Sequence, residues 1–415
     1  MKIQAPKGTK DIFFEETKAW QYIENIAREL FEMANFHEIR TPVFEYTELF
    51  ARGVGESTDI VNKEMYSFDK EKRSYTLRPE NTAGVVRSYI QNGLFKTSSP
   101  QKLWYKGPMF RYERPQAGRQ RQFHQIGIEM FGIDGGSADA EVILVAMRLF
   151  KKLKLTNLTL HLNNIGCPQC RNDYKETIKT SLKDEYNNLC EDCHRRYQVN
   201  PLRLLDCKSE KCQEIFSKEP TFSVINKDFI CDICKNNYND LLEILKDAGV
   251  ETKFNNKLVR GLDYYNGPVF EITSENLGAQ NAVCGGGRYD GLVELLGGPS
   301  TPGVGWALGM ERLISLINFE EQNYLDVFIV SDHLKESLLL ADLLRGNKVK
   351  VDMAFSKAKF GKQLDKANKL NAKFAIILGD DEIEQGFYTI KNLSTGDQFR
   401  YNEISDTIAC ILTNK

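Results

Sequence analysis

The sequence predicts an α+β domain built on an antiparallel sheet, a small helical insertion within that domain, and an α/β domain after it. Two strand-like runs, 102–112 and 122–131, lie too close together for a crossover helix, so antiparallel pairing is favoured. From about residue 166 to about 250 the chain is rich in Cys, Lys, Asp and Asn and shows only short helical patterns. From about Leu325, strand and helix alternate, as is typical of a small, largely parallel sheet.

These changes of pattern divide the chain into three domains, one of them split. The first domain comprises 1–165 and 251–320, the insertion 166–250, and the last domain 325–415. In the first domain, 15–36 has apolar residues at helical spacing, 137–153 predicts a second amphipathic helix, and 303–317 passes from a Gly-rich strand into a helix.

Charge and hydropathy exclude a chain that is strongly basic overall and a chain that spans a membrane. The 415 residues include 55 Lys and Arg and 57 Asp and Glu, a net charge of −2, so a nucleic-acid partner would have to bind a local basic patch. No apolar run reaches the ~18 residues that span a membrane. The N-terminal segment has no apolar h-region, so we expect a cytoplasmic enzyme with reduced cysteines.

Eight of the ten cysteines lie between Cys167 and Cys234, in four pairs. Taken in chain order, the pairs read C-x2-C-x19-C-x2-C and C-x4-C-x18-C-x2-C, spacings that resemble structural four-cysteine zinc sites. The candidate ligand sets are then Cys167, Cys170, Cys190 and Cys193, and Cys207, Cys212, Cys231 and Cys234. Which pairs combine stays open, and reduced thiols that bind no metal are the alternative.

Basic residues gather around one strand–loop–strand segment, in a chain that lacks the usual nucleotide-binding motifs. No P-loop and no dinucleotide fingerprint is present, so arginines are the expected phosphate ligands. Residues 101–130 hold six Lys or Arg and two Glu, a local charge of +4. A solvated basic hairpin is the plain alternative, but three further segments favour a binding site. They contain Arg312 at a helix start, Arg260 near Tyr264 and Tyr265, and Glu80 with Thr82.

These segments together resemble the signature motifs of one enzyme family. FRYERPQ…QFHQIGIEMFG (110–132) looks like motif 2 of a class II aminoacyl-tRNA synthetase, GVGWALGMERL (303–313) like motif 3, and the helix ending at Thr41-Pro42 like motif 1. RGLDYYNGPVFE (260–271) and CGGGRYDGL (284–292) are similar to the two histidine signatures of the histidyl-tRNA synthetases. The resemblance covers nearly the whole chain.

The resemblance implies that histidine and ATP form histidyl-adenylate, and that the 3′ end of tRNA(His) then receives the histidyl group. Arg111 would bind the α-phosphate and Arg312 the γ-phosphate, with Arg119 at the outer phosphates and Glu113 facing the adenine. Arg260 would lie opposite Arg111 and contact the substrate carboxylate and the α-phosphate, where other class II enzymes use a metal ion. Mg²⁺ would accompany ATP.

The resemblance also implies the histidine pocket and the tRNA contacts. Glu129 and Tyr265 would bind the imidazole ring, Tyr264 would line the wall, and the α-amino group would meet Glu80, Thr82 and Gln125. Arg114 and Gln116 would reach the acceptor end of tRNA, the insertion would lie over the acceptor arm, and 325–415 would bind the anticodon stem-loop. A homodimer formed through motif 1 is expected.

Two other functions fit parts of this pattern. A catalytically silent synthetase-like regulatory subunit of histidine biosynthesis would share the fold, but it is expected to lose the last domain and parts of RGLDYY and motif 2, which are intact here. A tRNA-binding or zinc-scaffold protein without chemistry would have no use for Arg260, Arg312 and Glu129 together.

Overall fold

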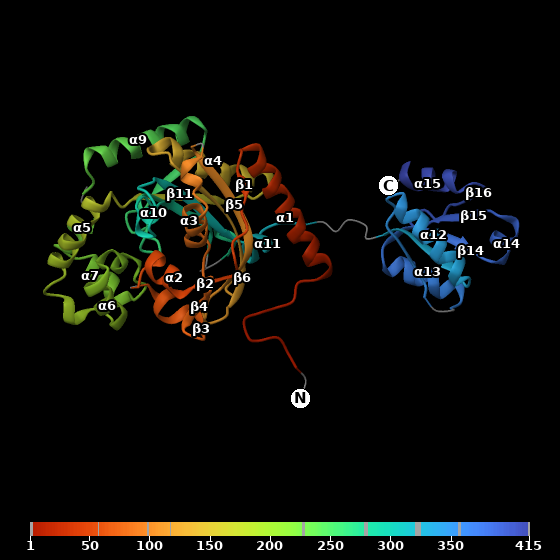
Figure 1. Ribbon diagram of the computed structural model, residues 1–415, viewed down its shortest axis with the longest axis horizontal. Coiled ribbons are helices and arrows are strands. Elements are labelled where there is room, and N and C mark those ends of the chain that lie inside the picture. The colour runs from red at the N-terminus through yellow and green to blue at the C-terminus, as the bar shows by residue number, and fades with distance from the viewer. Residues whose placement is uncertain are drawn as a thin grey trace. The chain divides into compact units, whose positions relative to one another are not determined.

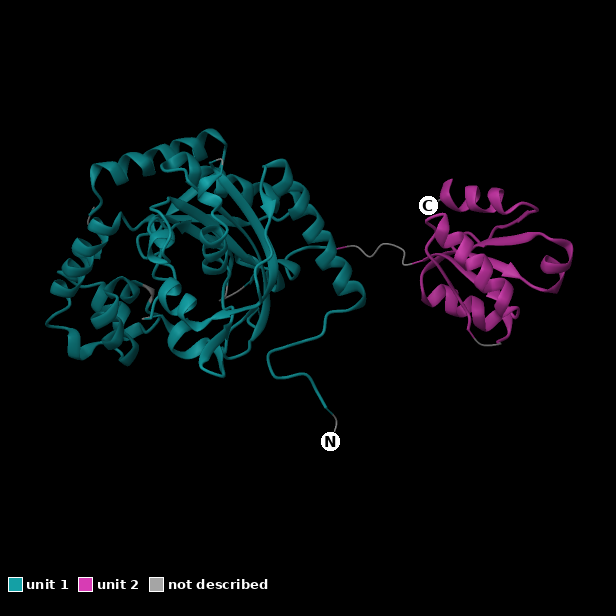
Figure 2. Ribbon diagram, in the orientation of Figure 1, with its two compact units in different colours: residues 1–318 teal, residues 319–415 magenta. Residues whose placement is uncertain are grey.

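The chain forms two compact units, Met1–Asn318 and Phe319–Lys415 (Figure 2). The computed structural model describes residues 3–56, 58–97, 99–116, 118–225, 229–277, 281–319, 325–355 and 358–413, apart from the side chain of Asp206. Among these residues, every helix is too short or too polar to cross a membrane.

The first unit is built on an eight-stranded sheet with the order β1-β5-β6-β11-β10-β9-β7-β8 (Figure 1). β1–β5 and β7–β8 are parallel, and the five other pairings are antiparallel, which confirms the predicted fold class. Ten residue pairs join β5 to β6, from Gln101–Phe131 to Phe110–Gln122. The strands are β1 (His37–Glu38), β5 (Gln101–Phe110), β6 (Gln122–Phe131), β7 (Leu158–Asn164), β8 (Thr252–Phe254), β9 (Asn266–Ser274), β10 (Ala282–Arg288) and β11 (Gly303–Gly309).

Apolar residues alternate between the two faces of this sheet, so both faces carry a core. On one face Trp104, Ile126 and Ile128 meet α1, α4, α9 and α11. On the other face Leu103 and Tyr105 meet α3 and α10. The helices are α1 (Phe14–Met33), α3 (Thr82–Gln91), α4 (Gly136–Lys152), α9 (Asp232–Asp247), α10 (Leu292–Leu295) and α11 (Met310–Ile314).

A small three-stranded sheet, with the order β2-β4-β3, flanks the main sheet. Its strands are β2 (Phe44–Tyr46), β3 (Tyr66–Lys70) and β4 (Arg73–Leu77), and α2 (Thr47–Val54) and the short helical segment η1 (Ile60–Glu64) connect β2 to β3. Several aromatic residues of this sheet are exposed.

The cysteine-rich segment folds into short helices around a core of its own. It comprises α5 (Pro168–Ser181), η3 (Tyr186–Asn188), α6 (Glu191–Val199), η4 (Pro201–Asp206), α7 (Glu210–Phe216) and α8 (Thr221–Ile225). The long helix α9 then leads back to β8 and packs against α4 (Figure 1). Two further short helices, η2 (Leu94–Lys96) and η5 (Glu275–Leu277), lie in the first unit.

The second unit is a five-stranded sheet with the order β13-β12-β14-β15-β16. β12 pairs in parallel with β13 and β14, whereas β14–β15 and β15–β16 are antiparallel, so the sheet is mixed rather than largely parallel. The short turn between β15 and β16 permits only a hairpin, which the alternating pattern did not reveal. The elements are β12 (Leu325–Ser331), α12 (Leu334–Gly346), β13 (Val351–Met353), α13 (Phe360–Lys369), β14 (Ala372–Leu378), α14 (Asp380–Gln385), β15 (Tyr388–Asn392), β16 (Gln398–Tyr401) and α15 (Ile404–Thr413).

The contact between α4 and α9 depends on a glycine. A Cβ at Gly136 would lie 2.2 Å from the carbonyl oxygen of Asn237 and 2.7 Å from the amide nitrogen of Leu241. We expect Gly136→Ala to push the two backbones apart and to lower the free energy of unfolding of the first unit by about 1–3 kcal/mol, as overpacking does. Urea unfolding followed by tryptophan fluorescence measures it, because all three tryptophans lie in this unit.

Gly261→Ala, in the same unit, is the matched control, since a Cβ there meets only Nη2 of Arg203, at 3.9 Å. Equal unfolding midpoints for Gly136→Ala and Gly261→Ala would show that α4 and α9 are free to move apart.

Candidate active site

A cleft of about 200 Å³, partly open to solvent, lies where the loop after β5 and the strands β6, β10 and β11 meet α11. Four arginines from distant parts of the sequence line it: Arg111, Arg119, Arg260 and Arg312. Gln125 and Glu113 lie on its wall as well. The structure thus brings together the basic residues that the sequence proposed as phosphate ligands.

Arg111 follows the last residue of β5, and backbone and aromatic contacts fix its side chain. Its Nε donates to the carbonyl of Pro79 at 2.9 Å, and its guanidinium lies over the ring of Phe123, 5.2 Å from the centroid. The nearest carboxylate oxygen, on Glu113, is 4.0 Å away. Most N–H groups of Arg111 therefore stay available to a ligand.

Arg119 belongs to the motif 2 loop, and Arg312 of motif 3 contacts this loop. Arg119 pairs with Glu113 at 3.0 Å. Arg312 donates from Nε to the carbonyl of Gly118 at 3.2 Å and from Nη1 to that of Ala282 at 2.7 Å. Burial lowers the pKa of Arg312, and the nearby Arg119 lowers it further, so an anion in the cleft would relieve repulsion between these two cations.

Arg260 is held in the cleft by Glu271, a residue that was not predicted to belong to the site. Its Nη1 lies 2.8 Å from Oε2 of Glu271, on β9. Burial disfavours the charge, but the Glu271 carboxylate, together with the nearby Tyr265, Cys284 and Tyr264, leaves the pKa of Arg260 raised. The guanidinium lies over Gly285, where a Cβ would come within 2.2 Å of Nη2. The glycines of CGGGRYDGL thus leave room for this arginine.

Three buried polar atoms at the cleft have no hydrogen-bond partner among the described residues. They are Nε of Arg260, Oε1 of Gln125 and Oε2 of Glu113, the last of which forms an ion pair with Arg119. A buried donor or acceptor without a partner costs free energy, so a ligand that supplies the missing partner gains affinity.

The other residues expected to bind histidine form a buried polar cluster next to this cleft. Gln125 and Glu129 lie on the same face of β6, because they are four residues apart on one strand. The remaining members of the cluster are Glu80, Thr82, Tyr105, Tyr264, Tyr265 and Tyr289, all of them buried.

Hydrogen bonds satisfy both carboxylates of the cluster. Glu129 accepts from the hydroxyls of Thr82 at 2.7 Å and Tyr289 at 2.6 Å. Glu80 accepts from the backbone N–H groups of Thr82 at 2.7 Å and Ala83 at 3.0 Å and so stabilises the start of α3. Burial raises the pKa of Glu129 to about 8, although the hydrogen bonds from Tyr289 and Thr82 oppose this shift.

Arg114 and Gln116, the predicted tRNA contacts, are exposed and lie outside the residues that line the cleft. Gln116 forms a backbone bridge to Arg119, which turns the motif 2 loop back on itself. The loop thus presents these two side chains to solvent while Arg119 faces the cleft.

Sequence reasoning missed Glu271, Tyr289 and Glu311. Glu271 and Tyr289 stand in the quoted signatures GPVFE and RYDGL, but only the folded sheet shows their contacts with Arg260 and Glu129. Glu311, next to Arg312, accepts from the backbone N–H of His124 at 2.9 Å and ties motif 3 to motif 2.

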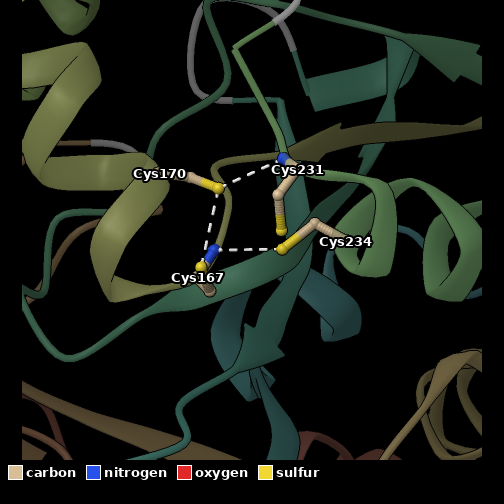
Figure 3. A group of neighbouring side chains, drawn as sticks. All are labelled: Cys167, Cys170, Cys231 and Cys234. Carbon is tan, nitrogen blue, oxygen red and sulfur yellow. Dashed lines mark hydrogen bonds between the residues drawn. The ribbon is translucent and has the colours of Figure 1, made fainter.

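The cysteines group differently from the chain-order sets. Cys167, Cys170, Cys231 and Cys234 come together (Figure 3), and so do Cys190, Cys193, Cys207 and Cys212. The chain-order grouping is therefore wrong. The chain enters the insertion through α5 and leaves it through α9 at one place, so the first and last pairs meet and enclose the inner two.

The largely antiparallel sheet and the arginines of motifs 2 and 3 in one cleft define a class II aminoacyl-tRNA synthetase. The histidyl-tRNA synthetase family profile matches residues 8–169 and 232–313, and an anticodon binding domain profile matches 322–411. The chain belongs to the histidyl-tRNA synthetase family. It acts as a histidine–tRNA ligase, which uses ATP, histidine and tRNA.

Individual relatives agree with this assignment. The chain is 48% identical over 410 residues to a histidine–tRNA ligase of Caldanaerobacter subterraneus subsp. tengcongensis, covering 96% of this chain and 97% of the relative. It is 47% identical over 405 residues to that of Thermodesulfovibrio yellowstonii, covering 96% of each. The apo crystal structure of the S. aureus histidyl-tRNA synthetase matches with a TM-score of 0.81 and 36% identity, over 99% of this chain and 100% of that one.

The raised pKa of Glu129 predicts a pH dependence of stability. The folded chain keeps a proton on Glu129 between about pH 4.3 and about pH 8, whereas the unfolded chain releases it, so the wild-type free energy of unfolding decreases as pH rises through this window. Glu129→Gln stays neutral, so its stability relative to wild type should increase from about pH 5 to about pH 8. Urea unfolding midpoints across this range measure the difference.

Glu32→Gln, at an exposed position on α1, should follow the wild-type pH profile. Parallel profiles for wild type and Glu129→Gln would show that the carboxylate is ionised in the folded state.

Proposed function

We propose that the two steps of the reaction, formation of histidyl-adenylate and transfer to the 3′ end of tRNA(His), both use the arginine-lined cleft. The observation that carries this proposal is the convergence of Arg111, Arg119, Arg260 and Arg312 beside a buried pair of carboxylates. The attack of a carboxylate on a phosphate brings two anions together, so positive groups must screen them. Because tRNA is a substrate, we expect the enzyme to act in the cytoplasm.

Arg111 would bind the α-phosphate, Arg119 the outer phosphates and Arg312 the γ-phosphate. The free N–H groups of Arg111 and the mutual repulsion of Arg119 and Arg312 support these roles. Glu113, which holds Arg119 in place, would face the adenine.

Arg260 would contact both the histidine carboxylate and the α-phosphate. Its salt bridge with Glu271 uses Nη1 and leaves Nε without a partner among the described residues. The side chain is therefore oriented by Glu271 while its Nε–H can still donate to a ligand. A guanidinium fixed before substrate arrives stabilises developing charge without reorganising in the transition state.

Mg²⁺ would enter with ATP and neutralise charge on its outer phosphates. The carboxylates that line the cleft are Glu113 and Glu311, and both already have partners, Arg119 and His124. The ion would therefore be held mainly by phosphate oxygens and water, as is usual for this cation.

Histidine would bind between the cleft and the buried cluster. Glu129 and Tyr265 would meet the imidazole ring, Tyr264 would form the wall, and Gln125 would offer its unpaired Oε1 to the α-amino group. Glu80 and Thr82 would complete the amino side.

Glu129 is already bonded to hydroxyls, so the imidazole would replace or share one of these partners. An amino acid without the ring nitrogens would leave buried polar groups unpaired, which gives strong selectivity.

The acceptor end of tRNA would approach over the motif 2 loop, where Arg114 and Gln116 are exposed. The second unit would bind the anticodon stem-loop, in agreement with its match to the anticodon binding domain.

We also infer a homodimer. Three aromatic side chains of the small sheet are exposed, Phe44 by 52%, Tyr46 by 48% and Phe68 by 46%, and they pack around Tyr75. A contiguous exposed aromatic patch next to motif 1 is suited to an interface.

The decisive experiment is ATP–pyrophosphate exchange with each amino acid in turn. Exchange should require histidine, and no other amino acid should support a comparable rate. No exchange with histidine would favour the catalytically silent alternative.

Arg260→His separates the role of this arginine from nucleotide binding. We expect the exchange rate to decrease by about 10²-fold or more, because the fixed positive charge beside the reacting atoms is lost, while the affinity for ATP changes little. Lys257→His, an exposed cation three residues earlier, should exchange as wild type does. A near wild-type rate for Arg260→His would rule out the proposed role.

Phe68→Asp tests the interface. A buried, unpaired carboxylate is costly, so the variant should elute as a monomer at concentrations where wild type elutes as a dimer. Phe399→Asp places the same change on an exposed aromatic of the second unit and should leave the elution position unchanged. A wild-type monomer, or a dimeric Phe68→Asp variant, would contradict the assignment of this patch.

A further inference from the structure

Three of the four cysteine pairs occupy the same place on a helix. Cys167, Cys190 and Cys231 are the N-cap residues of α5, α6 and α9, and the second cysteine of each pair follows three residues later. The first turn of a helix places these two positions on one side, and the positive end of the helix dipole favours thiolates. Each pair is therefore a local unit with two sulfurs facing the same way.

The outer cluster consists of Cys167, Cys170, Cys231 and Cys234, whose sulfurs all lie within 4.8 Å of one another. Its two pairs are bonded reciprocally (Figure 3). The N–H of Cys167 donates to Sγ of Cys234 at 3.3 Å, and the N–H of Cys231 donates to Sγ of Cys170 at 3.2 Å. Backbone N–H groups aimed at sulfur stabilise the thiolate form that a metal requires.

The inner cluster, Cys190, Cys193, Cys207 and Cys212, also receives backbone N–H groups on two of its sulfurs, although only one of its two pairs caps a helix. Its sulfurs also lie within 4.8 Å of one another, and those of Cys190 and Cys207 are 3.8 Å apart. The N–H of Cys190 donates to Sγ of Cys212 at 3.3 Å, and the N–H of Ser209 donates to Sγ of Cys207 at 3.4 Å.

We propose that each cluster holds one structural zinc ion, so that the insertion carries two zinc sites with nested ligand pairs. Four sulfurs at ~2.3 Å from one ion in a tetrahedron are about 3.8 Å apart, close to the separations observed here. Four cysteine ligands leave no open position for substrate or water, which is the pattern of a structural site. The eight thiols lie outside the residues that line the cleft, so neither ion takes part in the chemistry.

The outer site would fix the point where the chain enters and leaves the insertion, and with it a contact to the first histidine signature. Arg171, directly after Cys170, donates from Nη1 to the carbonyl of Tyr265 at 2.6 Å and from Nη2 to that of Asp263 at 3.3 Å. Asn164, at the end of β7, donates to the carbonyl of Cys234 at 3.1 Å.

The inner site would fix a second contact to the same signature. Asn200, directly after α6, donates to Oδ1 of Asp263 at 2.8 Å. Three arginines of this region surround Asp59, in the turn before η1: Arg195, Arg196 and Arg203. The two sites thus hold two arms of the insertion on the segment 263–265. This positioning role rests on the proposed function, whereas the metal sites do not.

Metal analysis of the wild-type protein, purified without chelator, provides the first test. The expected result is two zinc ions per chain, with X-ray absorption showing four sulfur ligands per ion. Less than a tenth of an equivalent of zinc, one equivalent in place of two, or iron in place of zinc would overturn the proposal.

Two double variants then distinguish nested from chain-order pairing, because the two pairings predict different numbers of remaining zinc ions in each variant. Cys167→Ser with Cys231→Ser damages only the outer site of the nested arrangement and should leave one zinc ion. Cys167→Ser with Cys190→Ser damages both sites and should leave none. Chain-order pairing predicts the reverse, and that result would overturn the nested assignment.

Cys410→Ser, in the second unit, is the control and should keep two zinc ions. If the double variants fail to fold, the wild-type protein still distinguishes nested from chain-order pairing. After partial chelation and alkylation, Cys167, Cys170, Cys231 and Cys234 should be labelled as one set and the inner four as another. Labelling that follows chain order would contradict the nested pairing.

Hydrogen exchange tests the positioning role. In the variant with Cys167→Ser and Cys231→Ser, amides of 258–265 should exchange at least tenfold faster than in wild type, and the KM for histidine should increase more than kcat falls. Unchanged exchange at 258–265 would overturn the positioning role. A wild-type protein with two zinc ions but no histidine-dependent pyrophosphate exchange would instead overturn the proposed function.

Discussion

Repulsion among four arginine side chains in one cleft is the constraint around which the rest of the site is arranged. Arg111, Arg119, Arg260 and Arg312 come from motif 2, the first histidine signature and motif 3, and each is oriented by an acceptor that the fold supplies. Glu113 and Glu271 provide carboxylates for two of them. Backbone carbonyls hold the other two, so guanidinium groups remain free to bind an anion.

The sheet makes this arrangement possible because one strand serves both halves of the site. β6 presents Gln125 to the cleft and Glu129 to the buried cluster on the same face. Gly305 lies opposite Glu129 in the ladder, and a Cβ there would come within 2.0 Å of its Oε2. The arginine-lined cleft and the buried polar cluster are therefore neighbours along one rigid element, which suits the proposed reaction of a carboxylate with a phosphate.

The insertion adds a further level of support. Arg171 and Asn200 bind the segment around Asp263, which follows Arg260 in the first histidine signature. Residues 170–231 fall outside the family match, so this support comes from a part of the chain outside the catalytic motifs. A helical insertion this small has a limited core, and cross-linking by metal is a common way to stabilise such a segment.

Local patterns allowed much of this to be predicted from the sequence. The short spacing of the strands around motif 2 permits only antiparallel pairing, and helical periodicity located α1 and α4. The arginines of the cleft were identified because their motifs are continuous stretches of sequence. The contact of Tyr289 with Glu129 was missed because the two residues are 160 positions apart along the chain. Glu271 lies only 11 residues after Arg260, but no local periodicity shows that the chain between them turns back and brings the two side chains together.

The sequence by itself determined the fold class, the family and the identity of the charged groups, because these depend on local periodicity and on contiguous motifs. Only the tertiary structure decided which groups meet. It paired Arg260 with Glu271 and surrounded Glu129 with hydroxyls. It also joined the first cysteine pair to the last, because the two ends of an inserted segment must return to the same place on the sheet.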